Sequence, residues 1–504
     1  MTPPAEITRR GLLAGAGASA AAIALASCGG SCDDSPDTAG LRSGFGGRIL
    51  QGGDPGYLEL AVPTAQRYGE TPKIVAECSS SRDVQRAYRF ARDNEMPFAV
   101  RGGGHNYAGF STTSGLLIST RGMDGIEIDR DRQRVTLGAG VLLGPAIREL
   151  RGTGLAIPTG RCNGVGVAGL TLGGGWGFGA RKFGLTADSL ISTEVVTPDG
   201  DLRTVSADEN PDLFWAMRGG GGGNFGINTS FTFRAFEVPK KATVFQFVWL
   251  DQAKIPDVTQ ALMELAAKAP REFTVEPVTS PFYNMAIPGR RPTNPVRLTA
   301  TGQYTGPEDE LRQLVGPLLR KHAPTGQEII ETGFFDAHEY LADATPVGWF
   351  SVHSSFLTAA LPRKATDEII DWASRWPVGS VVPDSNWGFF SFGGAVGDVA
   401  ADATAFPHRD AELMLKFETS WTNSDSAADT DAGIEWLNGF YDAIRPYTED
   451  DSAYVNFCNR NLDGWARAYY GKNLERLVEV KRKWDPDNAF SFAQSIPMKI
   501  SPLS

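Results

Sequence analysis

Two reactive side chains, His105 and Cys162, lie in segments that are rich in glycine. Three glycines, Gly102, Gly103 and Gly104, directly precede the histidine, and Cys162 opens the sequence Cys-Asn-Gly-Val-Gly-Val-Ala-Gly. Glycine has no Cβ atom, so a phosphate or a flat ring can approach the backbone and its N–H groups. Both residue types also occur as ordinary core side chains. Their place in two such loops predicts the attachment of a cofactor.

The elements that must carry these loops follow from the hydrophobic pattern. Short strands are predicted at 74–76, 98–100, 116–118, 125–129, 134–138, 194–197 and 227–236, and helices at 83–91, 145–152 and 213–217. The strand at 98–100 leads directly into the His105 loop. Strands and helices in succession predict an α+β fold class.

The pattern changes near Pro239. From there to about residue 450, alternating runs such as 244–249 and 389–393 predict one antiparallel sheet, with helices such as 255–268 and 308–315 on one face. A last helix is predicted at 474–484, ended by Asp485-Pro486. The aromatic residues of this central region suit an aromatic metabolite, a sugar or an alkaloid, but such residues are more often part of a core; they are Trp249, Phe282, Trp349, Trp387 and Phe389.

Composition and motifs exclude several classes of protein. At 504 residues the chain is too long for a single core, so two or three domains are expected. A net charge of −11 without a basic face argues against a nucleic-acid partner. The five histidines lack the spacing of a metal site. Two Gly-x-Gly-x-x-Gly matches begin at Gly164 and Gly221, but the second follows a predicted helix and precedes a strand, the reverse of a Rossmann entry.

Residues 1–28 are predicted to be a targeting segment. Arg9-Arg10 and the bland, alanine-rich stretch 11–26 are typical of a twin-arginine export signal rather than a membrane span. Leu25-Ala26-Ser27-Cys28 resembles a lipobox, in which Cys28 is lipidated; ordinary cleavage nearby is the alternative. Residues 29–45 would then be a flexible tether. The predicted location is extracellular or in the cell envelope, with a membrane contact only through the lipid on Cys28 or not at all.

In order along the chain, several motifs resemble those of the berberine-bridge-enzyme-like branch of the FAD-linked oxidases, which have the PCMH-type (vanillyl-alcohol-oxidase) fold. The matching segments are 101–109, 160–169, 172–177, 183–188, 221–226, 454–457, 470–473, 485–488 and 494–497. The resemblance implies FAD bonded at C8 by His105 and at C6 by Cys162. It also implies a two-part FAD-binding domain (46–239 and 454–504) around a central substrate domain (240–453).

The same resemblance assigns residues to the cofactor and to catalysis. The residues assigned to FAD are Arg101, Gly102, Gly103, Gly104, His105, Asn106, Cys162, Val165, Gly166, Gly169, Gly226, Ile227 and Asn456. Tyr454 is the first choice as catalytic base, and its phenol needs a nearby cation or hydrogen bonds to ionise at neutral pH. Lys416 and Glu418 share a face of the strand predicted at 413–419 and are candidates beside it. A solvent-exposed ion pair is the alternative for these two residues.

Three further positions affect the predicted chemistry. Tyr107 resembles the family tyrosine that lines the substrate pocket; a packed core tyrosine is the alternative. Phe457 stands where the family pattern has a second tyrosine, and Asn459 where many members have aspartate, which weakens a sugar substrate. Val165 resembles a valine that admits oxygen to the flavin.

These residues together predict a flavoprotein oxidase that oxidises an alcohol or amine carbon of a small molecule and reduces O2 to hydrogen peroxide. A dehydrogenase that passes electrons to a quinone or a redox protein is the nearest alternative. A non-catalytic flavin- or ligand-binding lipoprotein is an alternative of another class. No Gly-x-Ser-x-Gly elbow supports a hydrolase.

Overall fold

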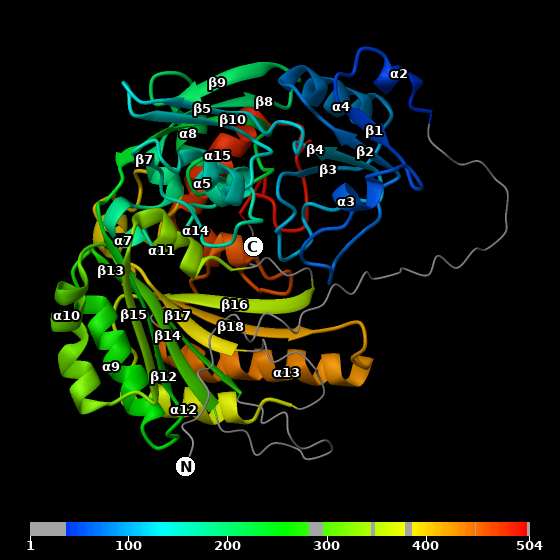
Figure 1. The fold of residues 1–504 in the computed structure, drawn as a ribbon. Helices are drawn as coiled ribbons and strands as arrows, with labels where there is room; N and C mark the ends of the chain where they lie inside the picture. Colours follow the sequence, from blue (N-terminus) through cyan, green and yellow to red (C-terminus); the bar gives the residue numbers. More distant parts are fainter. Residues whose placement is uncertain (1–36, 282–295, 344–347, 378–385, 449, 501–504) are drawn as a thin grey trace. The chain divides into compact units, whose positions relative to one another are not determined.

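The computed structural model describes residues 37–281, 296–343, 348–377, 386–448 and 450–500. The predicted leader, Cys28, the tether up to residue 36, Cys32 and Phe282 lie outside the described residues. Residues from Thr38 onward form one compact unit in which three larger sheets pack with their helices (Figure 1).

The first sheet delivers the His105 loop. Its strands lie in the order β1 (Arg48–Leu50), β2 (Ile74–Glu77), β4 (Leu116–Ser119) and β3 (Phe98–Arg101), with β2, β4 and β3 parallel. Helix α4 (Ser81–Asp93) connects β2 to β3 and begins where the Ser80 side chain accepts a hydrogen bond from the Asp83 N–H. Its buried Val84, Ala87 and Ala91 recur at helical spacing, so one face packs on the sheet.

The second sheet is antiparallel and shares its core with the end of the chain. Its order is β5 (Ile126–Asp129), β6 (Arg134–Gly138), β10 (Ile227–Arg234), β8 (Leu190–Val196) and β9 (Leu202–Ser206). Helix α15 (Leu474–Trp484) packs against α8 (Pro211–Ala216), and buried Leu474 and Leu477 join the same apolar cluster as Phe231. Figure 1 shows the red C-terminal helix among the green and cyan strands.

The third sheet is antiparallel throughout and has seven strands. Its order is β15 (Gly326–Thr332), β12 (Ala242–Trp249), β14 (Val296–Tyr304), β13 (Phe273–Pro281), β17 (Asn386–Ser391), β18 (Leu413–Trp421) and β16 (Trp349–Leu357). Helices α9 (Ile255–Lys268), α12 (Arg363–Ser374) and α13 (Ala427–Ile444) cover one face. Leu415 and Phe417 of β18 join their core, whereas Met414 lies in the cluster on the opposite face together with Tyr454. Alternation along β18 therefore turns Lys416 toward the face that carries Tyr454.

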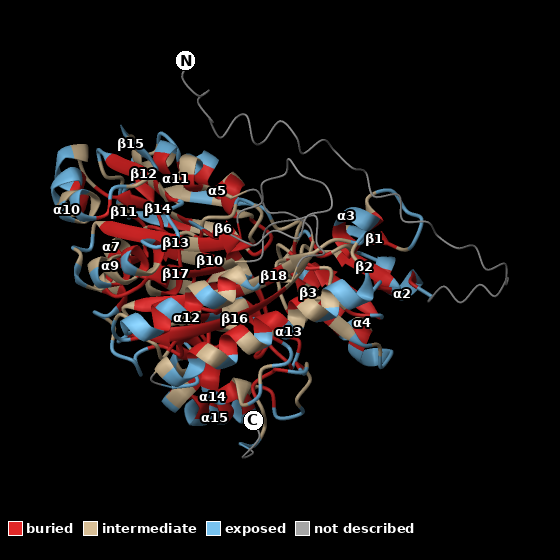
Figure 2. Cartoon of the chain, turned by 90° about the horizontal axis from the view of Figure 1, so that it is seen from below, coloured by how far each residue is buried: buried red, intermediate tan, exposed pale blue. Residues whose placement is uncertain are grey.

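Figure 2 shows that the strands of this sheet are largely buried, whereas the covering helices expose their outer sides. The remaining helices are α2 (Ala39–Arg42), α3 (Tyr57–Ala61), α5 (Leu143–Leu150), α6 (Val167–Leu172), α7 (Ala180–Phe183), α10 (Glu308–Lys321), α11 (Phe334–Leu341) and α14 (Trp465–Tyr470). Strands β7 (Leu155–Ala156) and β11 (Phe236–Glu237) pair with each other, and short 3-10 turns lie at Thr186–Ser189, Gly394–Val396, Arg445–Tyr447, Val455–Phe457 and Gly471–Asn473.

The predicted α+β class and the antiparallel central sheet are confirmed, and two elements differ in detail. The helix predicted at 145–152 is α5, which begins at Leu143 because Pro145 in the first turn needs no N–H donor, and ends before Gly152, whose φ is +83°. The strand predicted at 227–236 is divided, since β10 pairs with β6 and β8 up to Arg234, whereas Phe236 begins β11, which pairs with β7. The proposed domain limits stay predictions.

Within the described residues, no helix is long and apolar enough to cross a membrane, and no group of three or more potential ligand side chains could hold a metal ion. Cys78, Cys162 and Cys458 are free thiols.

Candidate active site

A cavity of about 610 Å3 lies between segments that are far apart in the sequence. Residues of the His105 loop, of 160–172, of 221–224, of 454–458 and of 489–494 line it, together with Lys416 of β18. Most of these stretches are those singled out from the sequence. The cavity therefore brings most of the predicted cofactor residues together with three of the four predicted catalytic residues, Tyr107, Lys416 and Tyr454.

The loops that carry His105 and Cys162 touch each other backbone to backbone. A Cβ atom on Gly103 would lie 2.3 Å from the backbone nitrogen of Gly166, and one on Gly166 would lie 2.5 Å from that of Gly103. Neither position tolerates a side chain without separating the loops. The glycines therefore hold His105 and Cys162 on the same cavity.

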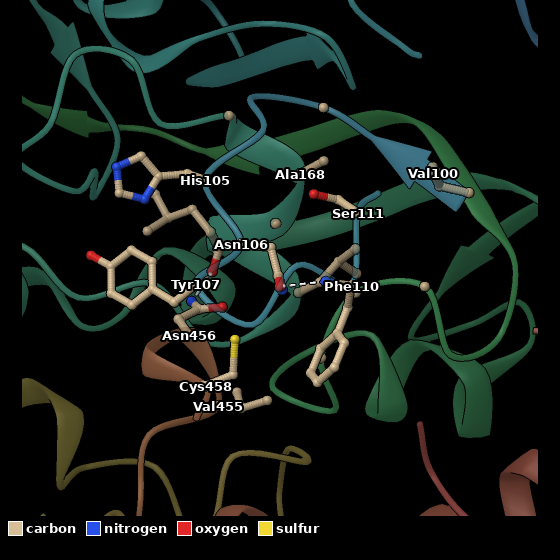
Figure 3. Close-up of a pocket in the computed structure, with 18 of the residues that line it drawn as sticks. Val100, His105, Asn106, Tyr107, Phe110, Ser111, Ala168, Val455, Asn456 and Cys458 are labelled. Carbon is tan, nitrogen blue, oxygen red and sulfur yellow. Dashed lines mark hydrogen bonds between the residues drawn. The ribbon is translucent and has the colours of Figure 1, made fainter. Parts of the chain in front are cut away.

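Asn106 shapes the histidine loop. Its side-chain oxygen accepts hydrogen bonds from the N–H groups of Ala108 (3.1 Å) and Phe110 (2.9 Å), the second of which is drawn in Figure 3. Burial lowers the pKa of His105 to about 4. The imidazole is therefore neutral at neutral pH and keeps a nitrogen lone pair with which to attack a carbon.

Cys162 lies beside a network of charged groups. Its backbone pairs with that of Asp343, and the guanidinium of the preceding Arg161 binds the carboxylates of Asp343 (2.9 Å) and of Glu276 on β13. Burial raises the pKa of the Cys162 thiol, and the positive charge of Arg161 opposes that effect. Arg161 itself lines the cavity.

The Tyr454 hydroxyl is buried among hydrogen-bond donors. Its oxygen accepts from the N–H of Gly175 (3.0 Å), the N–H of Trp176 (3.3 Å) and the Asn456 side-chain amide (3.1 Å). The amide also donates to the carbonyl of Leu170, which fixes its orientation. No acceptor for the phenol proton lies within hydrogen-bond distance among the described residues. Burial raises the pKa of Tyr454, and the three donors counteract part of that rise.

Lys416 and Glu418 are bound to each other, with 3.1 Å between Nζ and Oε2, and both are largely buried. Lys416 lines the cavity, whereas Glu418 does not. The structure thus places an ion pair at the site rather than on an exposed strand face.

Aromatic rings form one wall of the cavity. Tyr107 packs edge-on against Phe350 (4.7 Å between ring centres) and parallel to Phe457 (5.7 Å), and Phe390 lies beside Phe457. Tyr107, Phe390 and Phe457 line the cavity together with Trp176. Tyr107 is therefore both packed and pocket-lining, and burial raises its pKa well above 10.

Three residues assigned to the cofactor do not line the cavity. Arg101 is buried behind its loop, where it donates to the carbonyls of Ala61 (2.8 Å) and Ser111 (2.9 Å). Gly226 has a φ of +145°, and a Cβ there would lie 2.6 Å from the carbonyl oxygen of Val196. Ile227 is buried in the core of the first sheet. These residues support the loops from behind.

The site also contains a polar group that sequence reasoning missed. The hydroxyl of Ser111 is buried and has no hydrogen-bond partner among the described residues, although Ser111 lines the cavity (Figure 3). Gly169 also lines the cavity, and a Cβ atom there would meet nothing within 4 Å. An unsatisfied donor beside an open, glycine-edged space fits a large polar ligand such as FAD.

A buried ion pair fixes the C-terminal wall of the cavity. Lys481 and Asp485 are both fully buried and lie 2.7 Å apart. The ammonium also donates to the carbonyls of Asn224 (2.8 Å) and Phe490 (2.7 Å), and the carboxylate accepts from the N–H of Ala489 (2.7 Å). Asn224, Ala489 and Phe490 line the cavity, so this pair connects the glycine loop at 221–224 to the last segment of the chain.

Buried histidines predict acid sensitivity of the fold. Burial lowers the pKa of His408 and of His338 to about 4, below the value of about 6.5 in an unfolded chain. The unfolded state therefore binds more protons between pH 6.5 and 4, and their contribution to stability, complete above pH 6.5, is lost across that window. We expect the urea midpoint to fall from pH 7 to pH 4, and less steeply in His408→Gln. An equal pH dependence of the urea midpoint in the wild type and in His408→Gln would contradict the contribution of His408 to acid sensitivity.

Comparisons with known proteins agree with this geometry. A family model described as an FAD binding domain matches residues 72–206, and one described as berberine and berberine like matches residues 453–497. An uncharacterized FAD-linked oxidoreductase of Bacillus subtilis (strain 168), YgaK, is 36% identical over 462 residues, 90% of this chain and 97% of the relative.

Solved structures show the same fold. The wild-type Physcomitrella patens BBE-like 1 protein has a TM-score of 0.81 at 25% identity and covers 92% of this chain and 99% of its own. A glucooligosaccharide oxidase from Acremonium strictum, whose FAD is described as 6-S-cysteinyl and 8α-N1-histidyl, has a TM-score of 0.79 at 26% identity and covers 91% of this chain and 98% of its own.

The fold and the site thus define an FAD-linked oxidoreductase. The chain belongs to the berberine-bridge-enzyme-like family of FAD-linked oxidases.

Proposed function

We propose that this protein is an oxidase whose FAD is bonded to both His105 and Cys162, and that it oxidises an alcohol or amine carbon of a small molecule and reduces O2 to hydrogen peroxide. The observation that carries the proposal is the single cavity that His105, Cys162 and Tyr454 all line. A relative with the same fold has its FAD bonded through a cysteine and a histidine, which supports the double attachment.

Bound FAD would supply the hydride acceptor at this site. The glycine loops leave space and N–H groups for its phosphates, and Ser111 offers a further hydrogen bond. Tyr107 and Phe457 form a flat apolar wall against which a substrate can be oriented and from which water is excluded. Lys416 adds a charged group to the lining of the cavity.

Tyr454 is the proposed general base. Three hydrogen-bond donors surround an oxygen that has only two lone pairs as a phenol, and they stabilise the phenolate against the burial that raises the pKa of Tyr454. An anionic oxygen held in this way can accept the substrate proton as hydride leaves.

Oxygen is the proposed electron acceptor because Val165, a small residue, lines the cavity beside Cys162. A dehydrogenase that reduces a quinone or a redox protein is the competing proposal. Assays of peroxide formation and of dye reduction on a panel of aromatic alcohols, amines and oligosaccharides discriminate between them. Dye reduction without peroxide identifies the dehydrogenase, and a flavin that no panel member reduces favours a binding protein.

Export also belongs to the proposal. Arg9-Arg10 and the lipobox at Cys28 are its support, and a route that carries folded proteins suits a chain that binds a large cofactor. Radiolabelled palmitate on the wild type, absent from Cys28→Ser, would support lipidation.

The attachment is tested on the full-length protein purified after export. We expect a yellow pellet after acid denaturation and FAD mass on the peptides that contain His105 and Cys162. Because each side chain makes its own bond, His105→Ala and Cys162→Ala should each retain FAD on the remaining residue, and the double variant should release all its flavin into the supernatant. A colourless wild-type pellet without released FAD would refute the proposed function.

A further inference from the structure

Arg161 lies beside Cys162, the proposed attachment residue, and the attachment of FAD does not by itself account for the contacts that hold Arg161 there. It directly precedes Cys162 and lines the same cavity. Two carboxylates from the central region hold its guanidinium: Glu276, which is 4% exposed on its side chain, and Asp343 at 2.9 Å. The backbone of Asp343 pairs with that of Cys162, so the guanidinium of Arg161 and the backbone of Cys162 are both held by the Asp343 segment.

The charges that face the Cys162 thiol come from four elements of the chain. Arg161, which lies next to Cys162 in sequence, and Lys416 on β18 are positively charged. Glu276 on β13 and Asp343, which lies outside any strand, are negatively charged. Tyr107 of the histidine loop is a neutral phenol. The two cations, the thiol and the phenol of this group line the cavity, whereas Glu276 and Asp343 do not. Lys416 is itself paired with Glu418 at 3.1 Å, which leaves Arg161 as the main cation beside the thiol on the cavity side.

Bond formation at Cys162 requires the thiolate, because a thiol is a poor nucleophile. Burial works against ionisation, and an adjacent permanent cation works for it. Arginine suits this task better than lysine, since its planar guanidinium can bind two carboxylates at once and stays charged when buried.

We propose that Arg161 is a positioning residue that stabilises the Cys162 thiolate at the edge of the flavin and thereby promotes the second covalent bond, with Lys416 as a weaker contributor. This inference rests on the proposed function. In the balanced step an S–C bond forms at flavin C6, the S–H and C6–H protons leave to solvent, and the two electrons pass to O2, which takes up two protons to give hydrogen peroxide.

The test measures the two bonds separately in full-length protein. Wild type, Arg161→Met and Arg161→Lys are purified, incubated in air at pH 7 and pH 9.5, quenched in acid at intervals and analysed by peptide mass. We expect Arg161→Met to carry FAD on His105 as the wild type does but to form the Cys162 bond at least about tenfold more slowly at pH 7, a change of one pKa unit in the thiol. At pH 9.5 the Cys162 bond in Arg161→Met should form at least as fast as it does in the wild type at pH 7. Arg161→Lys should form it at an intermediate rate at pH 7.

Asp343→Asn is the variant with the opposite expected sign. It removes a negative charge that opposes the thiolate while Glu276 still holds the guanidinium, so the Cys162 bond should form faster at pH 7 than in the wild type.

Other outcomes separate the inference from the proposed function. A wild-type rate in Arg161→Met at pH 7, or a loss that pH 9.5 does not restore, overturns the role of Arg161 while the double attachment stands. Equal or slower bond formation in Asp343→Asn also overturns it. FAD on His105 alone in the wild type overturns the inference together with the second bond, and no FAD on either peptide overturns the proposed function.

Discussion

Replacing Tyr454 by phenylalanine is expected to slow flavin reduction by substrate about 10²- to 10⁴-fold, the usual contribution of a general base. The phenyl ring keeps the contacts with Phe406 and Phe457 and removes only the oxygen that three donors surround. The measurement is anaerobic stopped-flow absorbance of the flavin with a substrate found in the panel above.

Tyr107→Phe is the matched control, because Tyr107 also lines the cavity but its hydroxyl accepts no hydrogen bond from the residues that the structure describes. Its flavin reduction should change far less. The FAD content and the thermal midpoint of Tyr454→Phe should match the wild type. A reduction rate within tenfold of the wild type would remove Tyr454 as the base.

Replacing Lys481 by methionine is expected to lower the free energy of unfolding by about 3–5 kcal/mol. The methionine leaves the Asp485 carboxylate fully buried without its cation, and the carbonyls of Asn224 and Phe490 without a donor. Since these residues form a wall of the cavity, the amount of bound FAD should fall as well. Urea unfolding followed by tryptophan fluorescence and the flavin-to-protein ratio measure the two effects.

Lys483→Met is the control for that experiment. Lys483 binds Asp212 at 2.6 Å with 63% of its side chain exposed, and such pairs contribute about 0–1 kcal/mol. It lies two residues along the same helix and removes the same charge. Equal destabilisation by both substitutions would show that the buried pair has no special role.

Local patterns in the sequence pointed to many of the residues that line the cavity. His105 and Cys162 were apparent because glycine-rich loops have few structural uses, and the two-residue period of β18 placed Lys416 and Glu418 on one face. The sequence did not show whether the Lys416–Glu418 ion pair is exposed to solvent or lies at the cavity. That depends on which face of the sheet the rest of the chain covers. It likewise did not separate the glycines that line the cavity from Gly226, which only permits a close backbone approach.

Long-range partnerships could not be predicted. The two backbone donors to Tyr454 belong to Gly175 and Trp176, 279 and 278 positions earlier, and the carboxylates that hold Arg161 come from two separate segments of the central region. No periodicity connects such pairs, since their meeting depends on the topology of three sheets. Lys481 and Asp485 read as an ordinary helix end in sequence, and only packing shows that both are buried.

The place of the last wall of the cavity sets the order of events during biosynthesis. Asn224 accepts hydrogen bonds from Lys481 and Ile496, which lie 257 and 272 positions later in the chain, and closing so large a loop is a slow, entropically costly event. A chain that ends before α15 contains His105 and Cys162 but lacks the cavity-lining residues at 489–494. We therefore expect FAD to be bound only after these residues have folded, and a stop codon placed between Leu474 and Ala489 should yield protein that does not become yellow.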